Sequence, residues 1–407
     1  ARVASRQPAY FHQLKQEIQA KAGDSFEGNT GLRVFTSLDP VSQQELEAAV
    51  ASRVPNLLKK GGDKLEAAAI AVDRRTGEIR AMVAGKRVGY DGYNRVLNGR
   101  RQVGSLAKPA VYLAALSQPE KYTLATTLDD KPLTLRNKHG NQWAPRNYDR
   151  KYRQEVPLYQ GLVKSLNIPT VNLGMKVGIS EVIDTFEKLG VDRSEIPRVP
   201  SVFLGSFTLT PFEVAQMYQT ITNQGRKAPL SALRSIVDTD GNAVYRSLLR
   251  SSQKVDPNAA WLTTYAMQKA VKEGTGRYLT AYYPEYQLAG KTGTSNDTKD
   301  SWFVGVDDRE VTTLWVGRDD NRSTGLTGSS GALRVYSEYI KNRKASTLDL
   351  VPLDTIAMTG YLKNRNGTLA KNCVGDLDIP VWDYNGQLSE NCSANPVDWF
   401  KELFNKW

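Results

Sequence analysis

The sequence predicts an α+β fold, in which strands far apart in the chain close one sheet and helices lie between them. Two observations predict it. A hairpin pattern occupies 67–83, and further strand patterns return only at 286–316. The stretch between them contains capped helical segments, of which 210–225 is the best marked. Strands at both ends of a unit with helices between them indicate a shared sheet.

Length and composition narrow the class of protein. A chain of 407 residues has room for about two or three domains. Its 40% hydrophobic and 24% charged residues exclude a disordered or collagen-like chain. Two cysteines are too few for a disulfide-dense scaffold or a four-thiolate zinc site. Two histidines, His12 and His139, argue against a His-rich metal site and a Ser-His-Asp triad, so we expect neither metal nor cofactor.

The charge balance points to an anionic partner. Lysine and arginine (54) outnumber aspartate and glutamate (43), which gives a net charge of +11. Such a balance suits nucleic acid, an acidic membrane surface or an acidic polymer. Nucleic acid is disfavoured because no basic stripe with interleaved aromatic residues appears. Two interpretations of the charge remain. The basic residues form an ordinary solvent-exposed surface, or, more specifically, they are attracted to an anionic membrane surface. No apolar run reaches the roughly 18 residues of a membrane span.

The first 60 residues, 1–60, indicate a linker or docking segment that leads into the main unit. Residues 1–30 are polar and mixed, and we expect them to lie outside the core. The alternation at 32–36 predicts a half-buried strand. Asp39 and Pro40 then form an N-cap and first-turn pair that opens a helix.

Five strand patterns belong to the main unit, residues 61–345. They lie at 67–72, 78–83, 286–289, 302–306 and 311–316. The first two flank a turn and predict a hairpin, and the last two are separated by the charged residues 307–310. These segments are the predicted strands of the shared sheet.

Two helices in this unit have clear signals. Thr210 is an N-cap, Pro211 stands at the first helical position and Glu213 completes a capping box, while Gly225 marks the end. Apolar residues three apart predict a second helix over 180–189.

Three short motifs carry the chemistry, and each is weak alone. They are Ser105-Leu106-Ala107-Lys108, Ser165-Leu166-Asn167 and Lys291-Thr292-Gly293-Thr294. Ser-x-x-Lys recurs at 251–254 and Ser-x-Asn at 393–395. The context separates them, because only Ser105 opens an apolar helical stretch, whereas 251–254 is polar and 393–395 lies in a loop-rich tail.

The first motif suits a serine nucleophile with a lysine base. Residues i and i+3 share a helix face, so Lys108 is within reach of the Ser105 hydroxyl. Serine needs a base, and with no histidine near these motifs lysine is the best candidate. An ordinary lysine, with a pKa of about 10.4, is charged at neutral pH. Burial and a neighbouring cation lower that pKa, and Lys291 is that cation if the motifs converge.

The other motifs then have defined roles. Ser165 and Asn167 relay a proton and orient Lys108. Lys291, Thr292 and Thr294 hold a substrate carboxylate by charge-assisted hydrogen bonds, and Gly293 leaves bare backbone against which a substrate can lie. The backbone N–H groups of Ser105 and Thr294 form an oxyanion hole.

In order and context, the motifs resemble the active-site boxes of the class A penicillin-binding proteins. The chain is most similar to the transpeptidase region of the bifunctional 1b kind. Three further stretches fit, namely 143–149, 300–305 and 314–319, so that the resemblance covers roughly residues 30–345. The N-terminal Glu-Asp-x-x-Phe glycosyltransferase signature of the bifunctional members is not found in this sequence.

This resemblance implies the penicillin-binding transpeptidase (serine β-lactamase-like) fold, an antiparallel sheet flanked by helices, with an all-helical subdomain. It implies that Ser105 attacks the D-Ala-D-Ala bond of a peptidoglycan stem peptide, that a neighbouring amine completes the cross-link, and that β-lactams acylate the same serine. The implied location is the periplasmic face of the inner membrane, through an anchor absent from this chain, which is then a soluble fragment. Regulatory cell-wall proteins are candidate partners.

Residues 346–407 form a C-terminal extension that holds both cysteines. The implied exported location favours a disulfide between Cys373 and Cys392 over two free thiols.

Four alternatives remain open at the level of sequence. A DD-carboxypeptidase differs only in using water as the acceptor. A serine β-lactamase needs a carboxylate that activates water, and no confident Glu-x-x-x-Asn candidate is present. A β-lactam sensor acylates and stalls. A non-catalytic β-lactam-binding module that docks regulators is the alternative from a different class.

Overall fold

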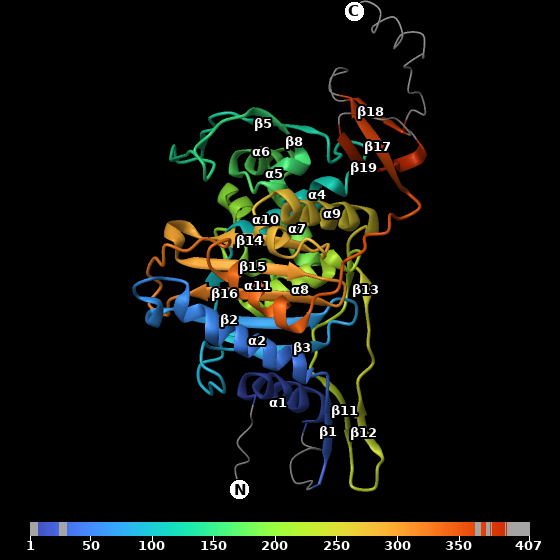
Figure 1. Ribbon diagram of the computed structural model, residues 1–407. Coiled ribbons are helices and arrows are strands. Elements are labelled where there is room, and N and C mark those ends of the chain that lie inside the picture. Colours follow the sequence, from blue (N-terminus) through green and yellow to red (C-terminus); the bar gives the residue numbers. More distant parts are fainter. Residues whose placement is uncertain are drawn as a thin grey trace, which may run out of the picture.

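The structure, a computed structural model, describes residues 7–23, 31–362, 368–371, 375, 377–386 and 388. A five-stranded antiparallel sheet runs through the middle of the molecule in the order β14-β15-β16-β2-β3 (Figure 1). Its strands are β2 (Glu66–Asp73), β3 (Ile79–Val83), β14 (Ala289–Thr294), β15 (Asp300–Val306) and β16 (Glu310–Gly317). Two strands from the start of the main unit therefore pair with three strands from its end, as the α+β prediction required.

Helices cover both faces of this sheet. Alternate residues of β2 divide between two cores: Ala67, Ala69 and Ala71 pack with α2 (Pro40–Arg53) and α11 (Ala332–Arg343). Ala68, Ile70 and Val72 join the larger core on the other face, which contains α8 (Pro211–Thr222) and α9 (Pro257–Glu273). Because both faces are buried, the interior of β2 is a continuous apolar run, residues 67–72, rather than alternating in polarity.

A helical region lies against the β14 edge of the sheet and carries two of the three motifs. It contains the 3₁₀ turn η4 (Gly104–Ala107) and the helices α4 (Lys108–Leu116), α5 (Leu158–Val163), α6 (Asn167–Val177) and α7 (Ile179–Lys188). Every residue of α4 is buried. A loop that extends between β5 (Thr127–Asp130) and β8 (Gln154–Pro157) carries β6 (Leu135–Arg136) and β7 (Gln142–Trp143).

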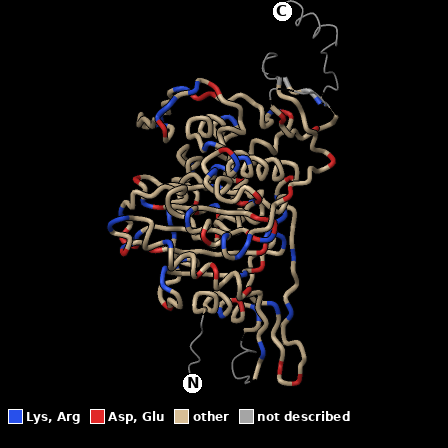
Figure 2. The backbone as a smooth tube through the Cα atoms, viewed as in Figure 1, with Lys and Arg blue, Asp and Glu red and all other residues tan. Residues whose placement is uncertain are grey.

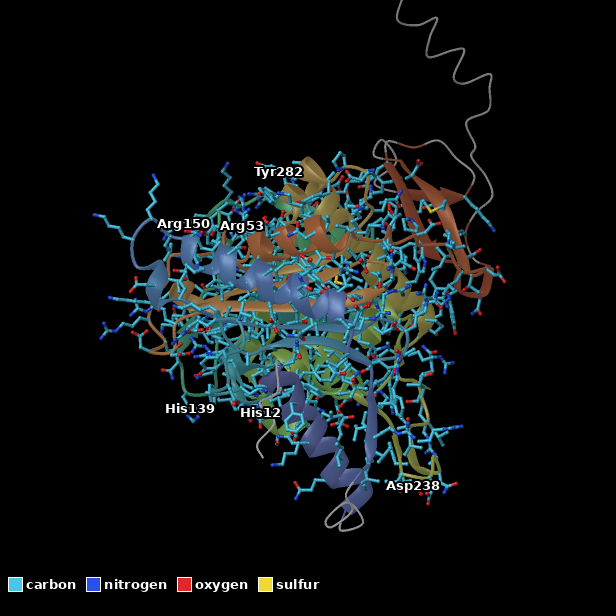
Figure 3. All side chains as sticks on the ribbon, turned by 60° about the horizontal axis from the view of Figure 1, so that its bottom comes forward. His12, Arg53, His139, Arg150, Asp238 and Tyr282 are labelled. Carbon is cyan, nitrogen blue, oxygen red and sulfur yellow. The ribbon has the colours of Figure 1, made fainter. Side chains whose placement is uncertain are left out.

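Smaller elements surround these two regions. A three-stranded sheet of β1 (Arg33–Thr36), β11 (Leu233–Val237) and β12 (Ala243–Arg246) projects from the body, with Asp238 near its outer end (Figure 3). A second three-stranded sheet holds β17 (Ile356–Leu362), β18 (Thr368–Lys371) and β19 (Leu377–Trp382). The remaining elements are α1 (Pro8–Ala22), α3 (Arg95–Asn98), α10 (Arg277–Tyr282), β4 (Arg101–Gln102), β9 (Thr208–Leu209), β10 (Arg226–Lys227) and β13 (Ser252–Gln253).

Most of the predicted elements are confirmed. The hairpin and both late strands are present, Asp39 caps α2, and the Thr210 hydroxyl caps α8 by accepting from Glu213 N at 3.1 Å. The helix predicted over 180–189 is α7. The strand predicted at 286–289 is misplaced, because β14 begins at its last residue and continues through the Lys-Thr-Gly-Thr motif. Helix α8 ends at Thr222, three residues before the predicted glycine.

The prediction that residues 1–30 lie outside the core is wrong for α1. Tyr10, Leu14 and Ile18 are buried in the main core, at 3%, 8% and 7% exposure. The Tyr10 hydroxyl donates to Ile79 O at 2.8 Å, which fastens the helix to β3. The predicted domain boundaries at 60/61 and 345/346 remain predictions.

Other sequence predictions fall partly outside what the structure describes. Cys373 and Cys392 both lie outside the described residues. Within the described ranges, none of the helices combines the length and apolarity that crossing a membrane requires. The same residues contain no cluster of three or more His, Cys, Asp or Glu side chains suited to a metal ion.

Candidate active site

The three motifs meet where α4, the α5–α6 link and β14 come together. The Lys108 amine Nζ lies 3.0 Å from Ser165 Oγ, 2.8 Å from Ser165 O and 2.6 Å from Asn167 Oδ1. The Lys291 amine lies 3.0 Å from the same Ser165 Oγ. Segments separated by 57 to 126 residues in the chain therefore share one hydroxyl group. The convergence predicted from sequence is present.

Both lysines are withdrawn from solvent. Lys108 is 0% and Lys291 1% exposed, and neither has a carboxylate partner among the described residues. Burial, and then the charge of Lys291, lower the pKa of Lys108 well below its usual value. Burial alone lowers the pKa of Lys291 to about 7. Burial thus disfavours the charged form of both amines, most strongly at Lys108, and a neutral amine is the condition for a lysine to accept a proton.

Gly104 allows the turn that carries Ser105 to pack against the end of β14. This residue has a φ of +54°, and a Cβ built on it would stand 2.3 Å from Thr294 O. Only glycine combines that conformation with so close an approach. Tyr218 strengthens the turn by donating its hydroxyl to Leu106 O at 2.8 Å. The backbone of Ser105 is therefore held beside Thr294.

Ser105 itself is half-buried and precedes the first residue of α4 by three positions. Within the described part of the chain, its hydroxyl forms no hydrogen bond, and the Lys108 amine donates hydrogen bonds only to Ser165 and Asn167. The predicted Ser105–Lys108 contact is thus absent, because the acceptors of the α5–α6 link occupy the amine. Hydrogen bonds of this kind are often long in a free enzyme and shorten when substrate binds.

The α5–α6 link holds Ser165 in an unusual conformation. Ser165 has a φ of +53°, which is rare for a residue with a side chain. The link then turns directly into α6, whose first residue is Asn167. Hydrogen bonds on both sides of the link hold this conformation. Ser165 bonds two lysines, and the Asn167 amide donates to Arg146 O at 2.7 Å. Strained residues of this kind cluster at functional sites.

Asn147 is a residue that the sequence analysis did not single out. Its side chain is 2% exposed, and its Oδ1 accepts from Asn167 N at 3.0 Å and from Ile168 N at 3.1 Å. Its Nδ2 donates to the buried Asp130 Oδ1 at 2.6 Å. Asn147 therefore caps the N-terminus of α6 at the residue that contacts Lys108. The only sequence signal was its place in the stretch 143–149 that fits the family.

The Lys-Thr-Gly-Thr segment contributes a strand edge. The Thr294 hydroxyl is half-buried and accepts from Gly328 N at 3.0 Å, while Thr292 bonds the Thr275 hydroxyl at 2.8 Å. A Cβ on Gly293 would stand 2.7 Å from Leu106 Cγ. The missing side chain therefore makes room for the nucleophile turn, and that side of the strand is not bare surface for a substrate.

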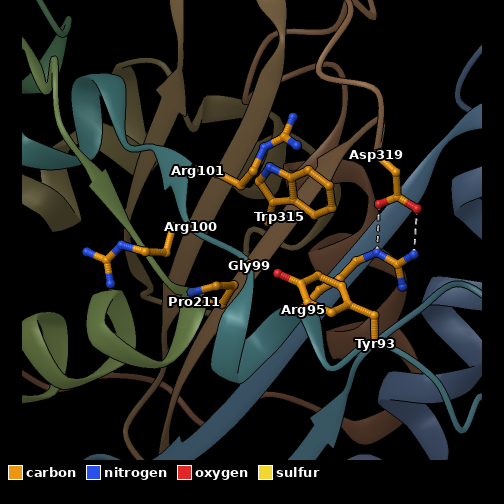
Figure 4. Close-up of a pocket in the computed structure, with 8 residues that line it drawn as sticks. All are labelled: Tyr93, Arg95, Gly99, Arg100, Arg101, Pro211, Trp315 and Asp319. Atoms are coloured by element: carbon orange, nitrogen blue, oxygen red, sulfur yellow. Dashed lines mark hydrogen bonds and ion pairs between the residues drawn. The ribbon is translucent and has the colours of Figure 1, made fainter.

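A buried carboxylate joins the nucleophile segment to the end of β14. Asp300 accepts from Arg101 Nε at 2.7 Å, from the Trp315 indole at 2.9 Å and from the Ser295 hydroxyl at 2.6 Å. Arg101 stands over the Trp315 ring and lines a small surface pocket beside the Arg95–Asp319 ion pair (Figure 4). This network ties the strand that precedes Ser105 to the strand end that carries Thr294.

An antiparallel sheet whose edge strand carries Lys-Thr-Gly, packed against a helix that begins with Ser-x-x-Lys, defines the class of β-lactam-recognising serine proteins. The family model described as the penicillin binding protein transpeptidase domain matches residues 67–332. The chain belongs to this penicillin-binding protein transpeptidase family.

Individual relatives agree with this assignment. The chain is 61% identical over 404 residues to penicillin-binding protein 1B of Vibrio cholerae, covering 99% of this chain and 52% of the relative. The crystal structure of penicillin-binding protein 1A from Haemophilus influenzae superposes with a TM-score of 0.84 at 19% identity, covering 96% of this chain and 78% of the other. A Mycobacterium tuberculosis penicillin-binding protein in complex with penicillin V gives a TM-score of 0.70 at 21% identity, over 86% and 97%.

These structural matches confirm the predicted fold class, the penicillin-binding transpeptidase fold. The chain spans about half the length of the curated relatives that it matches.

Proposed function

We propose that this chain is a peptidoglycan DD-transpeptidase that cross-links stem peptides through an acyl-enzyme on Ser105 and is acylated by β-lactams at the same residue. One observation carries the proposal: the buried Lys108 amine, which has a lowered pKa, is held by Ser165 and Asn167, and Ser165 is shared with Lys291. The membership of the transpeptidase family and the relatives named 1B support the same activity.

The acylation step begins with proton removal from Ser105. The neutral amine of Lys108 accepts the proton, and Ser105 Oγ attacks the carbonyl carbon of the D-Ala-D-Ala bond. The first-turn position of Ser105 supports this step, because a helix N-terminus favours negative charge as it develops. The bond to the terminal D-Ala breaks, and its nitrogen takes a proton returned through Lys108, Ser165 and Lys291. The 3.0 Å contacts of Ser165 Oγ to both amines suit such a relay.

The developing oxyanion lies between the backbone N–H groups of Ser105 and Thr294. The close approach of Gly104 to Thr294 O supports this placement, since it holds the two backbones side by side. Loss of one such donor typically costs about 3 kcal/mol of transition-state stabilisation. The substrate carboxylate is held by the half-buried Thr294 hydroxyl, with Thr292 and Gly293 on the same strand. Lys291, at 1% exposure, supplies positive charge from beneath.

The second half-reaction transfers the acyl group to an amine. The amine of a neighbouring stem peptide attacks the Ser105 ester and loses its proton to the neutral Lys108. The bond between the acyl carbon and Ser105 Oγ then breaks, and Lys108 returns the proton to that oxygen. In this proposal the reaction takes place at the periplasmic face of the inner membrane, and regulatory cell-wall proteins are candidate partners. A β-lactam forms the same ester by ring opening, and no small leaving group departs.

Mass spectrometry after penicillin treatment tests the nucleophile. We expect one adduct, on the peptide that contains Ser105, and no adduct in the variant Ser105→Ala. An adduct that persists in Ser105→Ala would show that the nucleophile is misassigned.

A second measurement identifies the acceptor. With a D-Ala-D-Ala peptide and a free D-amino acid, a transpeptidase produces the exchanged peptide, whereas a carboxypeptidase produces only the hydrolysed one. Hydrolysis without exchange would replace the proposal with the carboxypeptidase alternative, and the absence of either would leave a non-catalytic β-lactam-binding module.

A further inference from the structure

The loop between β5 and β8, residues 131–153, is the most positively charged part of the chain, and we call it the basic arm. It holds seven lysines and arginines against one aspartate, Asp149, so it carries six of the eleven net positive charges of the protein. Figure 2 shows Lys and Arg positions along this arm, at the end of the molecule opposite the N-terminus. The charge balance seen in the sequence is therefore concentrated at one place.

Four of these cations form no close ion pair within the described structure, although the charge of Lys151 contributes to the lowered pKa of Asp149. Their side chains are exposed and form neither an ion pair nor a hydrogen bond. The four residues are Lys138, Arg146, Arg150 and Lys151. By contrast, Arg153 pairs with Asp130 and Asp149, and Lys131 lies 3.5 Å from Asp129. Like charges gathered on one loop repel one another, so an anionic ligand that binds them relieves this repulsion.

The arm is fastened to the active site. Arg146 O accepts from the Asn167 amide at 2.7 Å, and the neighbouring Asn147 caps α6 at Asn167. Asp130, 0% exposed, accepts from Asn147 at 2.6 Å and from Arg153 N at 3.2 Å, which holds the two ends of the arm together. The arm that carries these cations is therefore hydrogen-bonded to the catalytic cluster at Asn167.

Two tyrosines on the arm add flat, exposed surface. Tyr148 is 76% and Tyr152 45% exposed, and they alternate in sequence with Arg146, Arg150 and Lys151, a short interleaving that the sequence analysis overlooked. Exposed tyrosine beside arginine is the composition of binding surfaces. Such rings also present a broad apolar face against which a sugar ring packs, while the cations bind carboxylates.

We propose that the basic arm binds the carboxylate-bearing glycan–peptide polymer beyond the reacting D-Ala-D-Ala end, and so selects polymeric substrate over a small acyl donor. This inference rests on the proposed function, since it names an extended substrate for the same site. It also assigns the positive charge to an anionic polymer instead of an anionic membrane, because the arm that carries the charge is hydrogen-bonded to Asn167 of the catalytic cluster.

The test removes three charges that are not part of the catalytic machinery. The arm variant is Lys138→Gln/Arg150→Gln/Lys151→Gln. The matched control is Arg246→Gln/Arg250→Gln/Lys254→Gln, three exposed cations without ion pairs in the described residues near β12 and β13. Each protein is measured for co-sedimentation with insoluble peptidoglycan, with the same material after methyl esterification of its carboxylates, and with vesicles containing phosphatidylglycerol.

We expect the arm variant to bind native peptidoglycan about tenfold more weakly at low salt, with the control within about twofold of the parent protein. Esterified peptidoglycan should bind the parent protein as weakly as it binds the arm variant. Penicillin acylation should stay within about twofold in all three proteins, which separates failure of this inference from failure of the proposed function. Equal losses in both variants, or a loss confined to the vesicles, would overturn the inference.

Discussion

Two stretches of this chain carry Ser-x-x-Lys, and they differ in burial and in the hydrogen bonds of the lysine. Ser105 and Lys108 lie between the sheet and the helical region, with Lys108 at 0% exposure. Ser251 and Lys254 lie beside the short strand β13, exposed, and the Ser251 hydroxyl has only a 3.5 Å contact to Arg226. Spacing alone therefore does not create a reactive lysine.

The difference shows what the fold adds to the motif. At the first site, burial and the charge of Lys291 lower the pKa of Lys108, and Ser165 and Asn167 fix the amine. At the second site, solvent surrounds both side chains and no second motif converges on them. The lowered pKa of Lys108 is a consequence of desolvation first and of the charge of Lys291 second, and the residue pattern alone does not produce it.

The largest expected effect comes from replacing Lys108, with the exposed Lys254 replaced in the same way as the control. Lys108→Met keeps most of the buried volume but removes the base, so we expect the rate of acylation by penicillin to fall about a thousandfold. Lys254→Met should leave that rate within about twofold. Stopped-flow kinetics with a fluorescent penicillin measures both, and thermal unfolding confirms that each variant is folded. A Lys108→Met protein that acylates at the normal rate would remove the distinction between the two sites.

The same contrast between a local pattern and its surroundings explains which helices and strands the sequence analysis could predict. Hairpins, caps and buried strands have local periodicity, so β2, β3, β15, β16 and the start of α8 were predictable. The strand β14 was misplaced because its motif is polar and glycine-rich, and lacks the apolar pattern of a core strand. The buried face of α1 was present in the sequence as Tyr10, Leu14 and Ile18 at four-residue spacing, but the polar composition around it concealed the signal.

Long-range contacts of the site had no local signature. Asn147 caps α6 from a loop 20 residues upstream, and Asp300 joins Arg101 across 199 residues. Neither pairing follows from spacing, because both depend on how the arm and the sheet fold against the helical region. The Ser-Lys-Lys cluster was predictable only because its three motifs recur together in one family.

A smaller effect is expected in the pH dependence of acylation, which isolates the second lysine. Lys291 has a pKa lowered to about 7, so above that pH it loses its proton and its attraction for a carboxylate. The second-order rate constant with a carboxylate-bearing β-lactam should therefore fall above pH 7, approaching tenfold per pH unit. At acidic pH the rate should also fall, because protonation of Lys108 removes the neutral amine that accepts the serine proton. The lowered pKa of Lys108 moves this loss to a lower pH than for an ordinary lysine.

The methyl ester of the same β-lactam is the control for this profile, since it has no carboxylate to bind. Its alkaline decline should be much weaker than that of the free acid. An identical decline for acid and ester would contradict the carboxylate role of Lys291 and limit this residue to the proton relay.

The smallest effect concerns two asparagines that repeat the buried and exposed contrast. Asn147 and Asn137 both accept two backbone N–H groups through Oδ1, but Asn147 is buried against α6 and Asn137 lies in the exposed β6–β7 turn. Asn147→Ala removes a helix cap, which typically costs about 1 kcal/mol. It also frees Asn167, so we expect acylation to slow by about three- to tenfold and the melting temperature to fall.

Asn137→Ala should change neither acylation nor the melting temperature appreciably, because its turn touches no part of the catalytic cluster. If Asn147 acts only on stability, Asn147→Ala will unfold more easily yet acylate at the parent rate below its melting temperature. If instead it positions Asn167, the rate will fall at all temperatures where the variant is folded, and the acid limb of the pH profile will shift, because the Lys108 amine loses a fixed acceptor. That shift separates positioning from simple stabilisation of α6.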